Sequence, residues 1–177
     1  VNSLQSNIDS VKELLKSNDI VLLQECLIYE ENSDIYYKIC DTHNFYYEPS
    51  KSSNSGYGRP IGGLVSFFNK QIYAEPLKIN ERILGVKCKT MNKYIIILNI
   101  YMPCDYHNAD SEIDYIENLA QISEVIQNEN FNEIYIFGDF NADPYKGRFY
   151  KKLEEFVKQN NLTIADTLLL PCDSFTY

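Results

Sequence analysis

The chain contains the stretch Glu133-Ile134-Tyr135-Ile136-Phe137-Gly138-Asp139-Phe140-Asn141. Its first part is a short apolar run, which is typical of a strand buried within a sheet. Its second part combines Gly, Asp and Asn, the residue types that favour turns. The stretch therefore predicts a buried strand that ends in a polar turn.

Two other stretches have the same plan. Ile20-Val21-Leu22-Leu23 is a continuous apolar run, and Gln24 and Glu25 follow it directly. Tyr94-Ile95-Ile96-Ile97-Leu98-Asn99-Ile100-Tyr101 is apolar nearly throughout. We expect both to be buried strands, the second of them central in its sheet.

Shorter strands and a hairpin are predicted between these runs. Residues 82–90 and 93–101 are both β-rich and are joined by Met91-Asn92, which predicts a hairpin. Further strands are expected at 45–47 and 62–68, on either side of a polar, Gly- and Ser-rich loop at 50–60.

Helical spacing of apolar residues appears in three segments, at 4–17, 111–128 and 149–160. Ser111 is the expected N-cap of the second helix. Hairpin-connected strands with helices between them predict an α/β fold, in which two packed sheets are flanked by helices.

Composition limits the class of protein. The chain has 177 residues, 45% of them hydrophobic, which is enough for one domain with a core of its own. No apolar run approaches the roughly 20 residues of a membrane helix, and no signal-peptide pattern opens the chain. The net charge of -9 lacks the basic footprint of a non-specific nucleic-acid binder. A divalent cation would supply its own local positive field, so a nuclease is not excluded.

The five cysteines are odd in number, widely spaced and free of any C-x-x-C pair: Cys26, Cys40, Cys88, Cys104 and Cys172. With only two histidines, this spacing argues against a zinc site. A disulfide framework is not expected without a secretory signal. We therefore expect reduced thiols in an intracellular protein of the nucleus or cytoplasm that is not secreted.

Polar side chains end the three buried strands: Glu25 on the first, Asn99 and Tyr101 on the second, and Asp139 with Asn141 on the third. In α/β architectures ligands bind where strands end. These residue types suit a hard divalent cation and a phosphate. Each also has an ordinary structural explanation, as a solvated strand-end charge, a plain turn or a tyrosine that caps a core strand.

Five short stretches occur in a distinctive order: Leu23-Gln24-Glu25, Arg59-Pro60-Ile61-Gly62-Gly63-Leu64, Asn99-Ile100-Tyr101-Met102-Pro103, Gly138-Asp139-Phe140-Asn141-Ala142-Asp143-Pro144 and Phe175-Thr176-Tyr177. This succession resembles the endonuclease/exonuclease/phosphatase superfamily, and most closely the endonuclease domains of non-LTR retrotransposons. The resemblance covers essentially the whole chain. It implies a deoxyribonuclease-I-like, four-layer α/β sandwich of two packed mixed sheets flanked by helices.

The resemblance also implies roles for single residues. Glu25 matches the glutamate that binds Mg²⁺, with Mn²⁺ as a possible substitute. Tyr101 matches the tyrosine that contacts the scissile phosphate, and Asp139 the aspartate that orients or activates the attacking water. Asn141 matches the asparagine that stabilises the pentacovalent phosphorus, and Thr176 a threonine that supports the site. Asn99 is expected to support the site as well.

Substrate and partners follow from the same resemblance. The substrate would be double-stranded DNA, nicked by Mg²⁺-assisted hydrolysis of a phosphodiester. Lys51 and Arg59, in the loop at 50–60, are expected near DNA phosphates. A reverse transcriptase domain would follow in the full polyprotein, and no membrane is involved.

The sequence departs from the family pattern at its two ends. As a single domain over residues 1–177, it is expected to lack the first strand and the C-terminal Ser-Asp-His segment. Cys26 and Cys104 also stand where relatives commonly have other residues. We therefore expect a truncated or degenerate copy, with little or no nuclease activity from this polypeptide alone.

Two alternatives remain at this point. Phosphatases and deadenylases share the scaffold, so the fold alone does not set the substrate. The chain could also be a degenerate, non-catalytic module that binds DNA or a partner without Mg²⁺.

Overall fold

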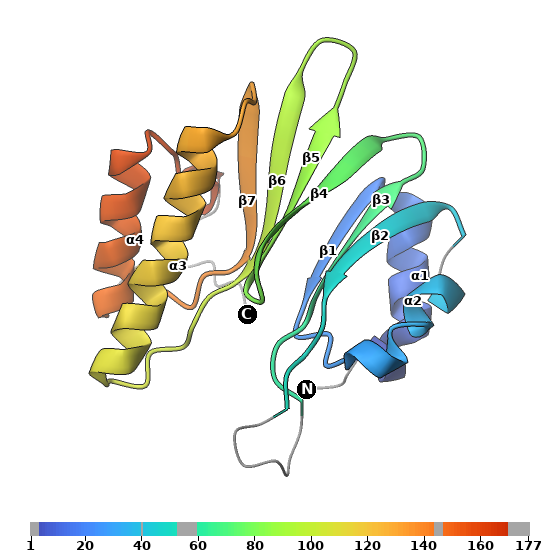
Figure 1. Ribbon diagram of the computed structural model, residues 1–177, viewed down its shortest axis with the longest axis horizontal. Coiled ribbons are helices and arrows are strands. Elements are labelled where there is room, and N and C mark those ends of the chain that lie inside the picture. Colours follow the sequence, from blue (N-terminus) through green and yellow to red (C-terminus); the bar gives the residue numbers. More distant parts are fainter. Residues whose placement is uncertain (1–3, 40, 53–59, 144–146, 170–177) are drawn as a thin grey trace. The chain divides into compact units, whose positions relative to one another are not determined.

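The computed structural model describes residues 4–39, 41–52, 60–143 and 147–169 (Figure 1). The chain divides into two compact units. The first comprises Val1–Cys104 and Glu129–Asn141, and the second comprises Asp105–Asn128 and Ala142–Tyr177. All seven strands described belong to the first unit.

The first sheet is wholly antiparallel, with the strand order β1-β3-β2. Its strands are β1 (Ile20–Gln24), β2 (His43–Glu48) and β3 (Leu64–Asn69). The helices of this unit are η1 (Leu4–Asn7), α1 (Ile8–Ser17), η2 (Glu30–Asn32) and α2 (Ile35–Ile39). The expected helix at 4–17 and the three expected strands are confirmed, whereas the short helix α2 was not predicted.

The second sheet has the order β4-β5-β6-β7. Its strands are β4 (Tyr73–Asn80), β5 (Ile83–Lys89), β6 (Tyr94–Tyr101) and β7 (Glu133–Asp139). The predicted hairpin is confirmed as the antiparallel pair β5-β6, and β7 joins β6 in parallel. The burial predicted for β1 and β7 is wrong, because both lie at the end of their sheets and most of their side chains are half-buried or exposed. Only this second sheet is mixed, because the described strands of the first contain no parallel pair.

Strand β4 was not predicted, because its residues do not read as a buried strand. Most of its side chains are exposed or half-buried, and Pro76 lies in its middle. Proline lacks the N–H that a central strand needs, so it is tolerated at a sheet edge. Pro76 pairs with Val86 of β5, and β4 is the last strand on that side of the sheet.

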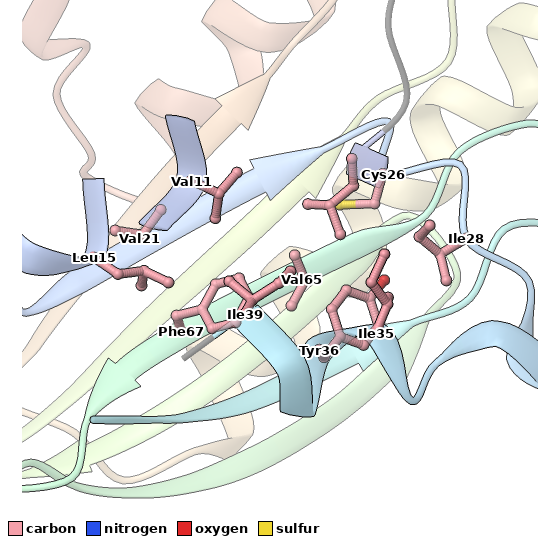
Figure 2. Close-up of a cluster of buried hydrophobic side chains, with 11 residues drawn as sticks. Val11, Leu15, Val21, Cys26, Ile28, Ile35, Tyr36, Ile39, Val65 and Phe67 are labelled. Atoms are coloured by element: carbon pink, nitrogen blue, oxygen red, sulfur yellow. The ribbon is translucent and has the colours of Figure 1, made fainter. Parts of the chain in front are cut away.

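The core of the first unit has two parts, one on each face of the first sheet. Val65 and Phe67 of β3 face α1 and α2, where they join a cluster that includes Val11 and Leu15 (Figure 2). Phe68, the next residue of β3, packs with Val86, Cys88 and Ile97 of the second sheet. Side chains alternate along a strand, so β3 can bind the helices on one face and the other sheet on its opposite face. The predicted packing of two sheets with helices outside is confirmed in this unit.

One buried polar group of this core is unpaired. The ring of Tyr36, which Figure 2 shows within the helix-side cluster, is completely buried between Phe45, Tyr47 and Phe67. Its hydroxyl has no hydrogen-bond partner among the described residues. A buried donor without a partner loses its hydration and gains nothing in return. We therefore expect Tyr36→Phe to leave the free energy of unfolding unchanged or to raise it by up to about 1 kcal/mol in urea denaturation.

Tyr46 provides the matched control. Its hydroxyl donates to the carbonyl of Ala74 and so links β2 to β4 across the two sheets. Tyr46→Phe removes the same oxygen atom but breaks a bond, so it should lower the free energy of unfolding by about 1 kcal/mol. Equal losses from the two variants would show that the Tyr36 hydroxyl is bonded after all.

The second unit contains α3 (Ala109–Asn128), α4 (Arg148–Gln159) and the short α5 (Ala165–Leu169). Helices α3 and α4 lie side by side, with the rings of Tyr115 and Phe149 stacked at a centroid distance of 4.1 Å. Arg148 joins the start of α4 to Asp105 and Glu112 by ion pairs of 2.8 and 2.9 Å. The predicted helices at 111–128 and 149–160 are confirmed.

The expected N-cap of α3 is wrong by one turn. Asn108, not Ser111, precedes the helix, and its side-chain oxygen accepts a hydrogen bond of 2.8 Å from the backbone N–H of Ser111. An N-cap side chain satisfies the N–H three residues later, so Ser111 is the capped residue. None of the described helices is both long and apolar enough to cross a membrane.

Candidate active site

The site lies in the first unit, where β1, β6 and β7 end. Strands β6 and β7 run in parallel, so their carboxyl ends meet, and Tyr101 is paired with Asp139 in the register. The N–H of Met102 donates to the carbonyl of Asp139 at 2.8 Å and continues the pairing past the end of β6. The sheet register therefore brings together two residues that lie far apart in the sequence.

Glu25 follows β1 on the opposite sheet and meets Tyr101 across the sandwich. The Tyr101 hydroxyl donates to Oε1 of Glu25 at 2.8 Å. Glu25 has a positive φ of 52°, a left-handed conformation that costs a side-chain-bearing residue about 1–2 kcal/mol. Backbone bonds from Cys26 to Gly63 and from Leu27 to Gly62 hold the chain just after it. Strained backbone of this kind is often found at functional sites, where the surrounding structure maintains it.

The environment of Tyr101 favours its neutral form. Burial raises its pKa well above the usual value, and the hydrogen bond to the Glu25 carboxylate raises it further. The hydroxyl thus keeps its proton and directs it at Glu25. Arg82 makes a separate contact with Tyr101: its guanidinium lies 5.9 Å from the ring centroid, and its Nη1 donates to the Tyr101 carbonyl at 3.3 Å.

A pH dependence of stability follows from this raised pKa. The contribution of Tyr101 is fully present below its unfolded pKa of about 10, and it is lost as the pH rises toward the higher folded value. We expect the free energy of unfolding to fall more steeply between pH 9.5 and 11 (roughly the range of tyrosine ionisation) in the natural chain than in Tyr101→Phe. Denaturant titrations at a series of pH values would measure it. Parallel curves for the two proteins would contradict the raised pKa of Tyr101, and with it the burial of its hydroxyl and the bond to Glu25.

Asp139 and Asn141 form a turn beyond β7. The backbone N–H of Asn141 donates to Oδ1 of Asp139 at 2.9 Å, and Asn141 has a positive φ of 47°. Its side-chain Nδ2 donates to the Met102 carbonyl at 2.8 Å, and its Oδ1 accepts from the Cys104 thiol at 3.4 Å. The Asp139 side chain is exposed. The turn therefore fixes an amide and presents a carboxylate to solvent beside Tyr101.

Asn99 is fully buried between the two sheets. Its Nδ2 lies within 3.2 Å of the carbonyls of Leu23 and Val65 and of the Ser66 hydroxyl. Its Oδ1 accepts a hydrogen bond of 2.7 Å from Nε2 of Gln24. The supporting position expected of Asn99 is thus inside the sandwich, behind Glu25 and Tyr101.

Two residues beside the site had no role assigned from sequence. Gln24 was seen only as a polar residue after a strand, although its even spacing from Ile20 and Leu22 puts it on their face of β1. Gly138 was treated as a turn former, but it has a φ of +136° and lies against the backbone of Ile100. The position of Gly138 directly before Asp139 was the one sequence feature that could have pointed to it.

The remaining expected residues are Lys51, Arg59 and Thr176. Lys51 pairs with Glu81 at 2.8 Å, and its backbone forms an isolated bridge with Ile61 at the base of the loop. Arg59 and Thr176 lie outside the described residues.

The donor set fits a magnesium ion. Among the described residues, no three His, Cys, Asp or Glu side chains gather as they would around a metal held by protein alone. Mg²⁺ commonly binds one or two carboxylates and completes its shell with waters and substrate phosphates. Glu25 is half-buried, and its carboxylate has lone pairs beyond the one that Tyr101 occupies. Glu25 would therefore hold the ion in the presence of a phosphate.

Solved structures, but not sequences, match this chain. No protein-family model and no curated protein sequence matches it. An AP endonuclease from Leishmania major superposes with a TM-score of 0.68 at 13% identity, over 89% of this chain and 62% of that protein.

Two further structures differ in function but share the fold. The endonuclease domain of TRAS1, a telomere-specific non-LTR retrotransposon, gives a TM-score of 0.63 at 15% identity over 90% of this chain and 67% of that domain. A 3′ phosphatase from Neisseria, bound to a product DNA hairpin, gives 0.58 at 14% identity over 89% and 68%. The chain thus spans 62–68% of the length of these proteins. It has the deoxyribonuclease-I-like α/β fold that the resemblance to endonucleases, exonucleases and phosphatases implied.

Proposed function

We propose that the chain is the endonuclease domain of a non-LTR retrotransposon and that it nicks double-stranded DNA by Mg²⁺-dependent hydrolysis of a phosphodiester. The observation that carries the proposal is the hydrogen bond between Tyr101 and Glu25, formed across the two sheets beside the Asp139–Asn141 turn. A carboxylate for a cation, a carboxylate for a water and two groups for a phosphate then lie around one strand end.

Each side chain has a part in this chemistry. Asp139 is exposed and orients or deprotonates the attacking water. Asn141 donates from Nδ2 to a phosphoryl oxygen with the proton that Met102 does not use. Tyr101 contacts the scissile phosphate only after its hydroxyl turns from Glu25, because one proton cannot serve both acceptors. Mg²⁺, when bound at Glu25, stabilises negative charge on the phosphate oxygens.

Because the chain is acidic overall, DNA binding must depend on a few positive groups near the site. With a net charge of -9, attraction to DNA depends on the cation and on single basic groups such as Arg82, Lys51 and Arg59. Target choice would follow from DNA shape and deformability, since we find no base-reading helix among the described elements. A downstream reverse transcriptase domain and an intracellular location belong to this proposal.

Nicking of supercoiled plasmid tests the function. The assay uses Mg²⁺ with an EDTA control and Glu25→Ala, on this chain and on a form extended through the first strand and the Ser-Asp-His segment. We expect little nicking by this chain and Mg²⁺-dependent nicking by the extended form, which EDTA and Glu25→Ala abolish. Strong nicking by this chain alone would refute the expectation that its truncation removes activity. No nicking by either form, with folding confirmed for both, would refute the proposed endonuclease function.

A phosphatase is the second candidate, because a 3′ phosphatase shares the fold. Thermal protection by inositol phosphates, but not by duplex DNA, would favour a phosphatase of inositol substrates. DNA binding without any Mg²⁺ dependence or cleavage would instead favour a non-catalytic module.

A further inference from the structure

The side chain of Gln24 lies immediately before the proposed metal ligand and points between the sheets. It donates from Nε2 to Oδ1 of Asn99 at 2.7 Å. Asn99 is completely buried, and its own Nδ2 is directed at Leu23 and Val65 of the opposite sheet. Every polar end of the Asn99 amide is therefore occupied by the first sheet.

This network repeats along both strands. Asn99 and Tyr101 are two residues apart on β6, so their side chains share a face. Asn99 contacts Leu23 and Gln24, and Tyr101 contacts Glu25. The two cross-sheet contacts thus follow one another toward the strand ends: the contact of Asn99 is buried, and the contact of Tyr101 lies in the site.

Glu25 needs such a support because β1 ends at Gln24. The left-handed backbone of Glu25 breaks the alternation of the strand, so strand geometry alone no longer aims its side chain. Backbone bonds at Cys26 and Leu27 fix the chain after Glu25. The Gln24–Asn99 bond is the corresponding side-chain tie before it.

We propose that Gln24 is a positioning residue that acts through Asn99 to hold the Glu25 carboxylate in its cation-binding place. The inference rests on the proposed function, because it assigns Glu25 to a cation. Groups that orient a metal ligand commonly change metal affinity or activity by about 10- to 100-fold when they are removed.

The test compares Gln24→Met with Tyr46→Phe. Methionine keeps the length and buries well but cannot donate to Asn99, whereas Tyr46→Phe breaks a different inter-sheet bond, between β2 and β4. On the form that nicks plasmid, Gln24→Met should raise the Mg²⁺ concentration for half-maximal rate about tenfold, with KM for DNA within about twofold. Tyr46→Phe should leave both unchanged. An equal Mg²⁺ shift in both variants, or a shift in KM alone, would overturn the proposal.

Gln24→Glu adds a pH readout. The introduced carboxyl group, while protonated, can donate to Asn99 as the natural amide does, but once ionised it places an acceptor against Oδ1. The rate of this variant relative to the natural chain should therefore rise as the pH is lowered from 8 to 6 (roughly the range into which burial can raise a carboxyl pKa). A relative rate that instead rises with pH would mean that the new carboxylate binds the cation, and it would overturn the role given to Gln24.

Hydrogen exchange separates this inference from the proposed function. Gln24→Met should speed exchange of the Cys26 and Leu27 amides by about fivefold or more through local opening, and Tyr46→Phe should not. Unchanged exchange in Gln24→Met would overturn the positioning role even if the protein nicks DNA. Faster exchange in a protein that never nicks would support the tie and refute only the nuclease.

Discussion

Asp139→Asn is expected to lower the rate of DNA nicking by about 10²- to 10⁴-fold, the range in which a general base contributes. Asparagine cannot take a proton from water, yet its side-chain oxygen can still accept the bond from the Asn141 N–H. The turn and the pairing of β7 with β6 should therefore survive. A single-turnover nicking assay on the active form, with urea denaturation to verify stability, measures the effect.

Asp41→Asn is the matched control for charge. Asp41 is exposed before β2, at the end of the first sheet opposite to Gln24. The substitution removes the same negative charge and should leave the rate within about twofold, as surface substitutions away from a site do. If Asp139→Asn retains the natural rate while Asp41→Asn does the same, Asp139 is not the base.

Much of the first unit could be predicted because its strands carry strong local signals. The apolar runs at β1, β6 and β7 are continuous, and such runs read as strands without further information. Of the three, only β6 lies between two described strands and is largely buried, as expected, whereas β1 and β7 are edge strands. Strand β4 gives no such signal, because Glu75, Pro76 and Lys78 interrupt its apolar residues. Asn108 and Ser111 are equally good caps in sequence, and only the helix start distinguishes them.

The residues of the candidate site could be predicted from the sequence, but their geometry could not. Glu25, Tyr101, Asp139 and Asn141 each end a predicted strand, so their convergence could be expected. The contact of Tyr101 with Glu25 and the burial of Asn99 depend on how two sheets pack, which no local pattern encodes. Gln24 was missed for the same reason, since a glutamine after an apolar run resembles a solvated residue.

Gly138→Ala should cause the largest loss of stability among single methyl additions in the sheet. A Cβ at position 138 would lie 2.0 Å from the carbonyl oxygen of Ile100 and 2.9 Å from its carbonyl carbon and nitrogen. These are backbone atoms of the central strand β6, so no side-chain rotation relieves the overlap. The φ of +136° adds strain for any L-residue. Together, overpacking and strain predict a loss of roughly 2–6 kcal/mol in the free energy of unfolding.

Gly147→Ala isolates the steric part of this effect. Gly147 also has a positive φ, of 108°, but a Cβ there would meet nothing within 4 Å. Gly147→Ala should therefore lower the free energy of unfolding only by the cost of backbone strain, about 1–3 kcal/mol. Because Gly138 pairs with Ile100 and precedes Asp139, displacement of β7 should also abolish nicking by the extended form in Gly138→Ala but not in Gly147→Ala. Equal unfolding free energies for the two variants in urea would contradict the close approach of β6 and β7, and with it the register that brings Asp139 beside Tyr101.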